Sequence, residues 1–241
     1  MRLIAIDLGD ADPELVADRC WQAGAAGIWE RDDALRVGVE DEVLADFLAA
    51  VTDLDPAEVT EVEAVELAGQ AVTVPMQGRD VELWVPPTVF GDGSHPTTTT
   101  CLELLDGLVA PGDDVLDVGC GSGALAIAAA LAGGVVTAID IDEAAVQATH
   151  DNAVRNDVAL TVSSTPLADI VADFDVVIAN LTAGAVSPLL GDLRRRTRPG
   201  GHLIVSGLLH DQWPDVRDEL GGDVVDEREA DGWLTALLHM P

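Results

Sequence analysis

The feature that most constrains this chain is a glycine-rich turn between a short apolar strand and a helix. The strand is predicted at Val115–Val118, glycines follow at positions 119, 121 and 123, and the helix is predicted at Ala124–Leu131. Glycine lets the backbone come close to a ligand, and a strand, turn and helix in this order are the usual context for binding nucleotides. Asp140 ends the next strand, where a carboxylate can hold the hydroxyls of a ribose.

The spacing of the turn excludes two common nucleotide sites. It differs from the G-x-G-x-x-G pattern of dinucleotide-binding proteins, and the chain has no lysine to complete a phosphate-binding P-loop. The turn therefore suits a nucleoside that carries no pyrophosphate. The alternative is a turn that serves only tight packing of the strand against the helix.

Strands and helices alternate from about Pro111 onward, which predicts an α/β fold with a parallel sheet covered on both faces. The predicted strands are Val115–Val118, Val135–Asp140, Leu160–Ser163, Phe174–Asn180 and His202–Leu208, and the predicted helices are Ala124–Leu131, Ala144–Asn156, Ala183–Arg196 and Asp215–Leu220. Two closing strands, Asp223–Arg228 and Trp233–Met240, predict an antiparallel hairpin that finishes the sheet.

The first part of the chain shows the pattern β-α-β-β-α-β, with its last strand at Val59–Leu67. This order is typical of a small ferredoxin-like domain. We predict that domain at residues 1–68, a linker at 69–78 and a second domain at 79–241. The first domain offers no obvious chemistry, so we expect it to bind or position a partner.

Charge narrows the choice of partners. The chain holds 44 acidic and 12 basic residues, all of the latter arginines, for a net charge of −32. Such a surface disfavours direct binding to nucleic acids or to anionic membranes, and it attracts a cationic partner. The alternative is that the acidity serves solubility or adaptation to salt.

Three cysteines form no disulfide framework, and they predict a reducing compartment. The N-terminus lacks the apolar core of a signal peptide, and the sequence has no run of 18 apolar residues that would span a membrane. We therefore expect a cytoplasmic protein without a membrane partner. The five histidines and three cysteines show no metal-ligand spacing, so no metal is expected.

The turn Asp117–Gly123 resembles the D-x-G-x-G-x-G motif of class I methyltransferases that use S-adenosylmethionine. The resemblance implies a seven-stranded, Rossmann-like domain with S-adenosyl-L-methionine as its cofactor. It also implies that Gly119, Gly121 and Gly123 approach the methionyl part and that Asp140 binds the ribose. Asp142, two residues further on, is a further candidate neighbour of the ribose.

Three further segments narrow the family: FGDGSHPTT at 90–98, DVVIANLT at 175–182 and RPGGHLIVSGLL at 198–209. Together with the glycine turn they resemble the family that methylates large-subunit ribosomal protein L-eleven. That family usually has threonine where this chain has Asp92. The segment GAAGIWER at 24–31 is similar to the small substrate-recognition domain of the same family.

Pro96 suits the first turn of a helix, which places Ser94 or His95 near the N-cap and the hydroxyls of Thr97 and Thr98 at the helix N-terminus. A methionyl carboxylate fits such a place, and the family resemblance assigns Thr98 to the cofactor. The alternative for the threonines is simple capping. His95 is a base, a cap or a packing residue, and the two structural roles are favoured.

Asn180 ends a buried strand, where an amide at the carboxyl edge of a parallel sheet faces the ligand crevice. The resemblance implies that Asn180 is catalytic and binds the cofactor, because relatives use this position to hold the nucleophilic nitrogen or the cofactor. No aromatic residue follows to stack on a flipped base, which favours a flexible protein amine as the acceptor. The alternative is an asparagine that only caps the next helix.

The resemblance implies an enzyme that transfers a methyl group from S-adenosylmethionine to amino groups of a basic ribosomal protein. Three alternatives stay open. The acceptor is a lysine of another protein, such as an electron-transfer flavoprotein, or a small molecule, or the protein binds the cofactor without catalysis.

Overall fold

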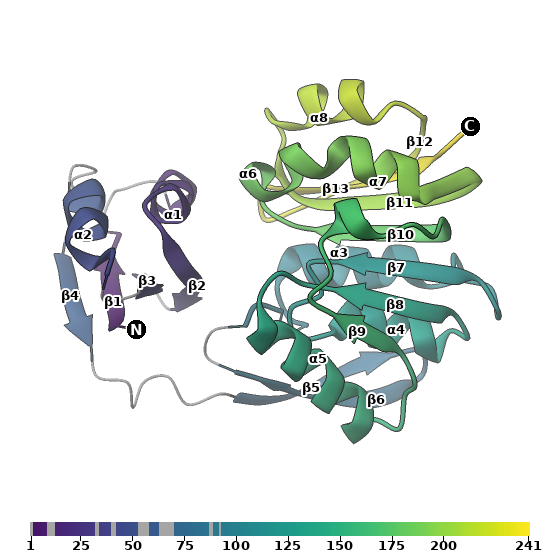
Figure 1. Cartoon of the computed structure of the whole chain (residues 1–241), viewed down its shortest axis with the longest axis horizontal. Coiled ribbons are helices and arrows are strands. Elements are labelled where there is room, and N and C mark those ends of the chain that lie inside the picture. The colour runs from purple at the N-terminus through teal and green to yellow at the C-terminus, as the bar shows by residue number, and fades with distance from the viewer. Residues whose placement is uncertain are drawn as a thin grey trace. The chain divides into compact units, whose positions relative to one another are not determined.

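The computed structural model describes residues 2–8, 13–31, 34–39, 42–52, 58–62, 70–86, 89–91 and 93–241. Its internal contacts divide the chain into two compact units (Figure 1). The first unit comprises Met1–Gln70 and Pro86–Phe90, and the second comprises Ala71–Val85 and Gly91–Pro241. The functional domain boundaries 1–68, 69–78 and 79–241 stay a prediction.

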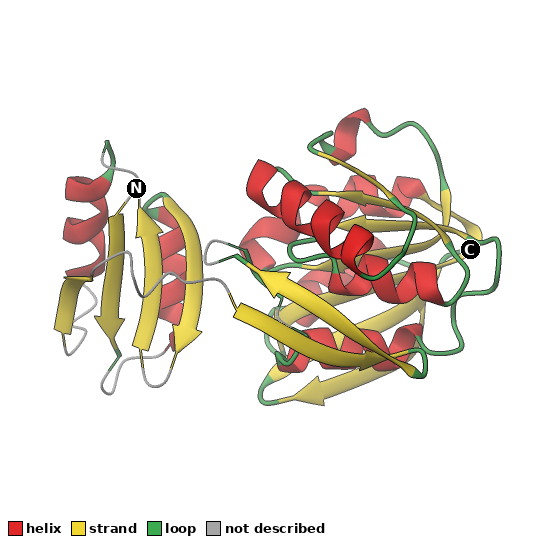
Figure 2. Ribbon diagram, turned by 90° about the horizontal axis from the view of Figure 1, so that it is seen from below, coloured by secondary structure: helices red, strands yellow, loops and turns green. Residues whose placement is uncertain are grey.

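The first unit has the element order β1 (Arg2–Asp7), α1 (Pro13–Gln22), β2 (Ala25–Arg31), β3 (Ala34–Val39), α2 (Leu44–Thr52) and β4 (Glu58–Val62). Its strands form an antiparallel sheet in the order β2-β3-β1-β4. Ile4 and Ile6 point to one face of β1 and are buried with Val16 of α1 and Phe47 of α2, so both helices cover that face (Figure 2). The ferredoxin-like classification and the role in substrate recognition stay predictions, and part of the predicted strand at 59–67 lies outside the described residues.

The second unit takes in the hairpin of β5 (Gln70–Met76), from Ala71 onward, and β6 (Arg79–Val85), and then α3 (Pro96–Leu105). The elements that follow are β7 (Asp114–Val118), α4 (Ala124–Leu131), β8 (Val135–Ile139), α5 (Glu143–Arg155), β9 (Thr161–Ser163), β10 (Phe174–Asn180), α6 (Ala183–Val186), α7 (Leu190–Arg196), β11 (Thr197–Leu209), α8 (Trp213–Leu220), β12 (Asp223–Ala230) and β13 (Trp233–His239). Short 3₁₀ turns lie at Leu167–Asp169 and Ser187–Leu189.

The central sheet has seven strands in the order β12-β13-β11-β10-β7-β8-β9. Strands β7 to β11 are parallel, and β13 and β12 continue the sheet as an antiparallel hairpin. This arrangement confirms the predicted parallel sheet and its closing hairpin. It brings the carboxyl ends of β7, β8 and β10 to one edge of the sheet.

Helices cover both faces of this sheet because neighbouring strand residues point to opposite sides. Val115 and Ile178 face a core shared with α3, α4 and α5, whereas Leu116 and Val177 face a core shared with α7 and α8. Both cores are fully buried at these positions. The continuous apolar runs of β7 and β10 are therefore explained by burial on two faces.

Segment 69–78, expected to be a linker, is mostly a strand in the structure. β5 occupies Gln70–Met76 and pairs with β6. Val74 and Met76 are buried while Thr73 and Pro75 are exposed, which is the alternation of a strand with one face on the core. The small and polar residues around it obscured this pattern in the sequence.

Two asparagines hold the hairpin to α5. Asn152 accepts from the N–H of Trp84 (2.7 Å) and donates to its carbonyl (3.0 Å), and Asn156 does the same at Glu82 (3.0 and 2.7 Å). Four residues of a helix rise about 6 Å, and two residues of a strand span about 6.6 Å. The two spacings match, so both amides reach the same edge of β6.

The single helix predicted at 183–196 is interrupted in the structure. A 3₁₀ turn at Ser187–Leu189 separates α6 from α7. Pro188 lies in this turn and has no N–H to donate to the preceding turn, so the α-helical ladder stops there.

Candidate active site

The glycine turn links β7 to α4 as predicted. Gly119, Gly121 and Gly123 have φ angles of 75°, 53° and 85°, a region that side-chain-bearing residues rarely adopt. A Cβ at Gly119 would lie 2.4 Å from Cδ2 of Leu181, and one at Gly123 would lie 2.9 Å from the side chain of Thr149. Conformation therefore favours glycine at both positions, and at Gly123 the close approach of the α5 backbone at Thr149 also leaves no space for a side chain.

Asp140 follows β8 and is bonded to this turn. Its Oδ2 accepts from the N–H of Gly121 (3.0 Å), and its Oδ1 accepts from the N–H of Asp142 (3.0 Å). Burial raises the pKa of Asp140, and the two backbone hydrogen bonds oppose that rise. Asp142 has a structural task of its own, since its side chain caps α5 by accepting from Ala144 N–H (2.8 Å).

Asn180 lies at the same edge. Val118 of β7 pairs with Ile139 of β8 on one side and with Ala179 of β10 on the other. The next residue of each strand is therefore Asp140, Gly119 or Asn180, and the three lie side by side where parallel strands end. Thr182, two residues beyond Asn180, is the N-cap of α6, so Asn180 does not cap the next helix.

Thr98 reaches this edge from α3. It is buried in the first turn of the helix, and its Oγ1 lies 3.5 Å from Nδ2 of Asn180. The structure therefore brings the six predicted site residues to one edge of the sheet: Thr98, Gly119, Gly121, Gly123, Asp140 and Asn180. Their roles toward a cofactor stay predictions.

His95 is the N-cap of α3. Its Nδ1 accepts from the N–H of Thr97 (3.3 Å) and lies 2.8 Å from Thr97 Oγ1. Its ring packs edge-on against Trp233, with 5.6 Å between ring centroids. These contacts support the structural roles expected for His95. Asp92, in the preceding loop, lies outside the described residues.

Sequence reasoning assigned no role to the carboxylate of Asp117, which the structure places below the turn. The residue is buried, and its Oδ2 has no hydrogen-bond partner among the residues that the structure describes. Burial raises the pKa of Asp117 to about 7, and the neighbouring charge of Asp140 adds to the rise. An acid that begins a glycine motif at the end of a buried strand was the available signal.

Helix α5 also supports the turn, which the sequence did not reveal. Thr149 donates to the carbonyl of Gly121 (2.9 Å), and Asn152 donates to the carbonyl of Ser122 (2.8 Å). Both side chains are fully buried and lie three residues apart on the helix, hence on one face. Ser122 in turn bonds the carbonyl of Gly91 through its hydroxyl, so the loop before α3 is tied to the turn.

This arrangement can hold a nucleoside linked to an amino acid. The glycines expose backbone to a ligand, Asp140 offers carboxylate oxygens to paired hydroxyls, and the N-terminus of α3 favours a carboxylate. Asn180 adds an amide that both donates and accepts.

Comparison with known proteins shows which proteins this chain is similar to. The family model described as ribosomal protein L11 methyltransferase (PrmA) matches residues 16–239. The chain is 33% identical to the ribosomal protein L11 methyltransferase of Symbiobacterium thermophilum, in an alignment that covers 98% of this chain and 84% of that protein.

Two solved structures are similar to this fold. The ribosomal protein L11 methylase of Lactobacillus delbrueckii subsp. bulgaricus superposes with a TM-score of 0.59 at 29% identity, covering 64% of this chain and 82% of that one. A 16S rRNA methyltransferase of T. thermophilus, solved with AdoMet and guanosine, gives a TM-score of 0.63 at 18% identity and covers 89% and 57% of the two chains. The second likeness concerns the fold alone.

Proposed function

Because the chain belongs to the ribosomal protein L11 methyltransferase family, we propose that it transfers methyl groups from S-adenosylmethionine to amino groups of ribosomal protein L11. The observation that carries the proposal is the shared edge where Asp140, Gly119 and Asn180 end three neighbouring parallel strands. This is the edge at which open α/β sheets bind their ligands.

The residues at this edge fit S-adenosylmethionine. Each oxygen of Asp140 accepts one backbone N–H and keeps a second lone pair, so both oxygens can still accept from ribose hydroxyls. Gly119 and Gly121 let the backbone approach the methionyl part of the cofactor. Thr98 lies at the N-terminal, positive end of the α3 dipole, which favours binding of the methionyl carboxylate. When bound, this cofactor supplies a methyl group activated by a sulfonium.

The remaining task of the chain is to align an amine. The Nδ2 of Asn180 is directed at Thr98, so its Oδ1 is turned away from Thr98 and can accept a hydrogen bond from the acceptor amine. When the amine is held in the correct position, the reaction no longer depends on a random encounter of two molecules. This positioning raises the rate by several orders of magnitude. The amine must be neutral to react, so it has to lose its proton before transfer.

We extend the proposal to the partner and the place of action. The net charge of −32 favours a basic acceptor over direct contact with nucleic acid. No helix within the described part of the chain has the length and hydropathy needed to cross a bilayer. We propose that the enzyme acts in the cytoplasm on free or ribosome-bound L11.

The test is incubation of the protein with methyl-labelled S-adenosylmethionine and purified L11, followed by mass spectrometry of the product. Methylated amines on L11 are expected, and a mock preparation purified identically from cells without the gene serves as the control for contaminating activity. A parallel incubation uses a whole-cell extract in place of purified L11. Label found there on another protein or on a small molecule, and not on L11, would show that the acceptor is a different molecule. Binding of the cofactor with no label transferred to anything would leave a non-catalytic binding protein.

A further inference from the structure

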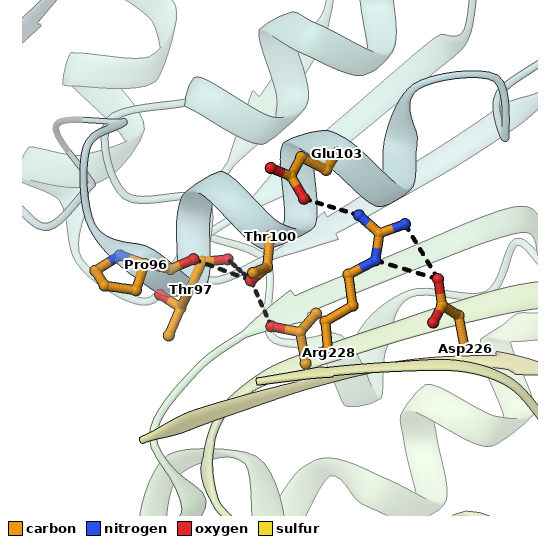
Figure 3. A network of polar contacts seen from close by, with 7 residues as sticks. Pro96, Thr97, Thr100, Glu103, Asp226 and Arg228 are labelled. Atoms are coloured by element: carbon orange, nitrogen blue, oxygen red, sulfur yellow. Dashed lines mark hydrogen bonds and ion pairs between the residues drawn. The ribbon is translucent and has the colours of Figure 1, made fainter. Parts of the chain in front are cut away.

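Three buried hydroxyl groups join α3 to strands β13 and β11 of the sheet. Thr100 Oγ1 lies 2.7 Å from Thr235 Oγ1 of β13, and Thr235 Oγ1 lies 2.5 Å from Ser206 Oγ of β11. Thr100 also donates to the carbonyls of Pro96 and Thr97, both at 3.0 Å (Figure 3). All three hydroxyl-bearing residues are buried, and Thr235 is the one polar residue among the buried positions of β13.

The hydroxyl of Thr235 is the middle member of this chain of hydroxyls, because its Oγ1 contacts both Thr100 Oγ1 and Ser206 Oγ. In each pair either oxygen can be the donor, since each hydroxyl can donate one hydrogen bond and accept others. Removing the middle hydroxyl would break both contacts at once, which is costly in a buried place.

The chain of hydroxyls returns to the active site. Ser206 is the register partner of Asn180 in the neighbouring strand, and its carbonyl accepts from the N–H of Leu181 (3.1 Å). Thr98, two residues before Thr100, lies 3.5 Å from Asn180. The three side-chain contacts, the strand pairing of Asn180 with Ser206 and the helix backbone between Thr98 and Thr100 therefore form a closed ring through Thr98, Asn180, Ser206, Thr235 and Thr100.

The ring contacts α3 on two different sides of the helix. Successive helical residues are about 100° apart, so Thr98 and Thr100 point in very different directions from the axis of α3. One side chain meets β10 and the other meets β13. A second link between α3 and the closing hairpin, from Glu103 to Arg228 (2.8 Å), is exposed (Figure 3) and by its exposure contributes little.

We infer that Thr235 and Ser206 are positioning residues, which set the place of Thr98 beside Asn180 without touching the cofactor themselves. The inference rests on the proposed function, because it takes Thr98 as a cofactor contact and Asn180 as the residue that aligns the amine. The first turn of α3 is the part of the site that comes from outside the parallel strands. The ring fixes the first turn of α3 to the strands of the sheet.

The test measures the dissociation constant of S-adenosylmethionine by calorimetry, well below the melting temperature of each variant. Thr235→Val keeps the volume and removes the hydroxyl, so we expect its dissociation constant to rise about tenfold, and that of Ser206→Ala to rise similarly. Thr235→Ser restores the hydroxyl and loses a methyl group. It should bind within about twofold of wild type even though it is less stable.

Two matched controls separate positioning from stability. Thr197→Val removes a buried hydroxyl from the opposite end of β11, where it bonds the carbonyl of Leu193 (2.9 Å). Glu103→Gln weakens the exposed link between α3 and the hairpin. Both should bind the cofactor like wild type.

Wild-type affinity in Thr235→Val would overturn the inference, and so would an equal loss in Thr197→Val. If Thr235→Val does not fold, Ser206→Ala decides by the same criterion. Failure of the wild-type protein to bind S-adenosylmethionine would instead overturn the proposed function, so the two failures are distinguishable.

Discussion

The backbone N–H of Gly121 donates a 3.0 Å hydrogen bond to Oδ2 of Asp140, so the turn that ends β7 holds the acid that ends β8. The carboxylate therefore has a fixed orientation before any ligand arrives. A preorganised acceptor of this kind costs less conformational entropy on binding than a mobile one. We therefore expect the loss of the Asp140 side chain to lower the affinity for S-adenosylmethionine directly.

We expect Asp140→Ala to weaken the binding of S-adenosylmethionine by about 1–3 kcal/mol, because the ribose hydroxyls and the N–H of Gly121 all lose an acceptor. Isothermal titration calorimetry measures the change. Asp218→Ala, which removes an exposed acid of α8, is the control for lost charge. An unchanged affinity in Asp140→Ala would reject the ribose assignment.

Asn180→Ala should lower kcat about tenfold or more at saturating cofactor, because the amide that aligns the amine is gone. Asn180→Asp keeps one carbonyl-like acceptor and should retain part of the rate. Single-turnover kinetics with labelled cofactor measure the chemical step. A normal rate in Asn180→Ala would leave this residue a structural element of the edge.

Asp117 should make the stability of the protein depend on pH. Burial raises the pKa of Asp117 to about 7 in the folded state. The contribution of Asp117 to the free energy of unfolding is therefore fully present below its ordinary pKa near 4 and is lost as pH rises through about 7. Asp117→Asn cannot ionise. We therefore expect the variant to gain on the order of 2 kcal/mol in unfolding free energy, relative to wild type, between pH 5 and pH 8.

Urea denaturation of the cofactor-free proteins at the two pH values measures this difference. The large negative charge of the chain also varies with pH, but it is common to both proteins and cancels in the comparison. A gap between variant and wild type that stays constant with pH would show that Asp117 does not titrate in this range.

Asn152→Ala should lower the free energy of unfolding by about 2–4 kcal/mol, because it leaves groups of Trp84 and Ser122 without their hydrogen bonds. Amide hydrogen exchange should also become faster at Trp84. Gln147→Ala is the matched control, since it removes an exposed amide from the same helix, where it bonds Asp151. Equal stability of the two variants would contradict the anchoring role.

Salt should weaken the encounter with the acceptor. If the acceptor is basic, as proposed, its attraction to a chain of net charge −32 raises the association rate and is screened by ions. We expect kcat/KM to fall from low to moderate salt while kcat changes little. A flat or rising curve would assign the acidity to solvation in a salty environment.

Local patterns in the sequence were enough to predict the second unit in outline. β10 at Phe174–Asn180 and α4 at Ala124–Leu131 have the predicted bounds, because long apolar runs and a glycine turn are local signals. The same signals place Asp140 and Asn180 at strand ends, and parallel pairing then brings them to one edge.

Contacts between distant segments were not predictable in this way. The bonds from Asn152 to Trp84 join residues 68 positions apart, and the link from Thr100 to Thr235 joins residues 135 apart. No periodicity marks an asparagine or threonine as the partner of a particular remote group. β5 was missed for a related reason, since its alternation is short and it becomes recognisable only against the core that buries Val74.

The side chains of Asn152 and Asn156 bind the main chain of β6 at Glu82 and Trp84. Every residue type except proline presents the same N–H and carbonyl, so replacement of the side chain of Glu82 or Trp84 leaves the attachment intact. Trp84 is 42% exposed and is bonded to the asparagine that also supports the glycine turn. Evolution can therefore vary the outer surface of this hairpin while each descendant inherits the same scaffold.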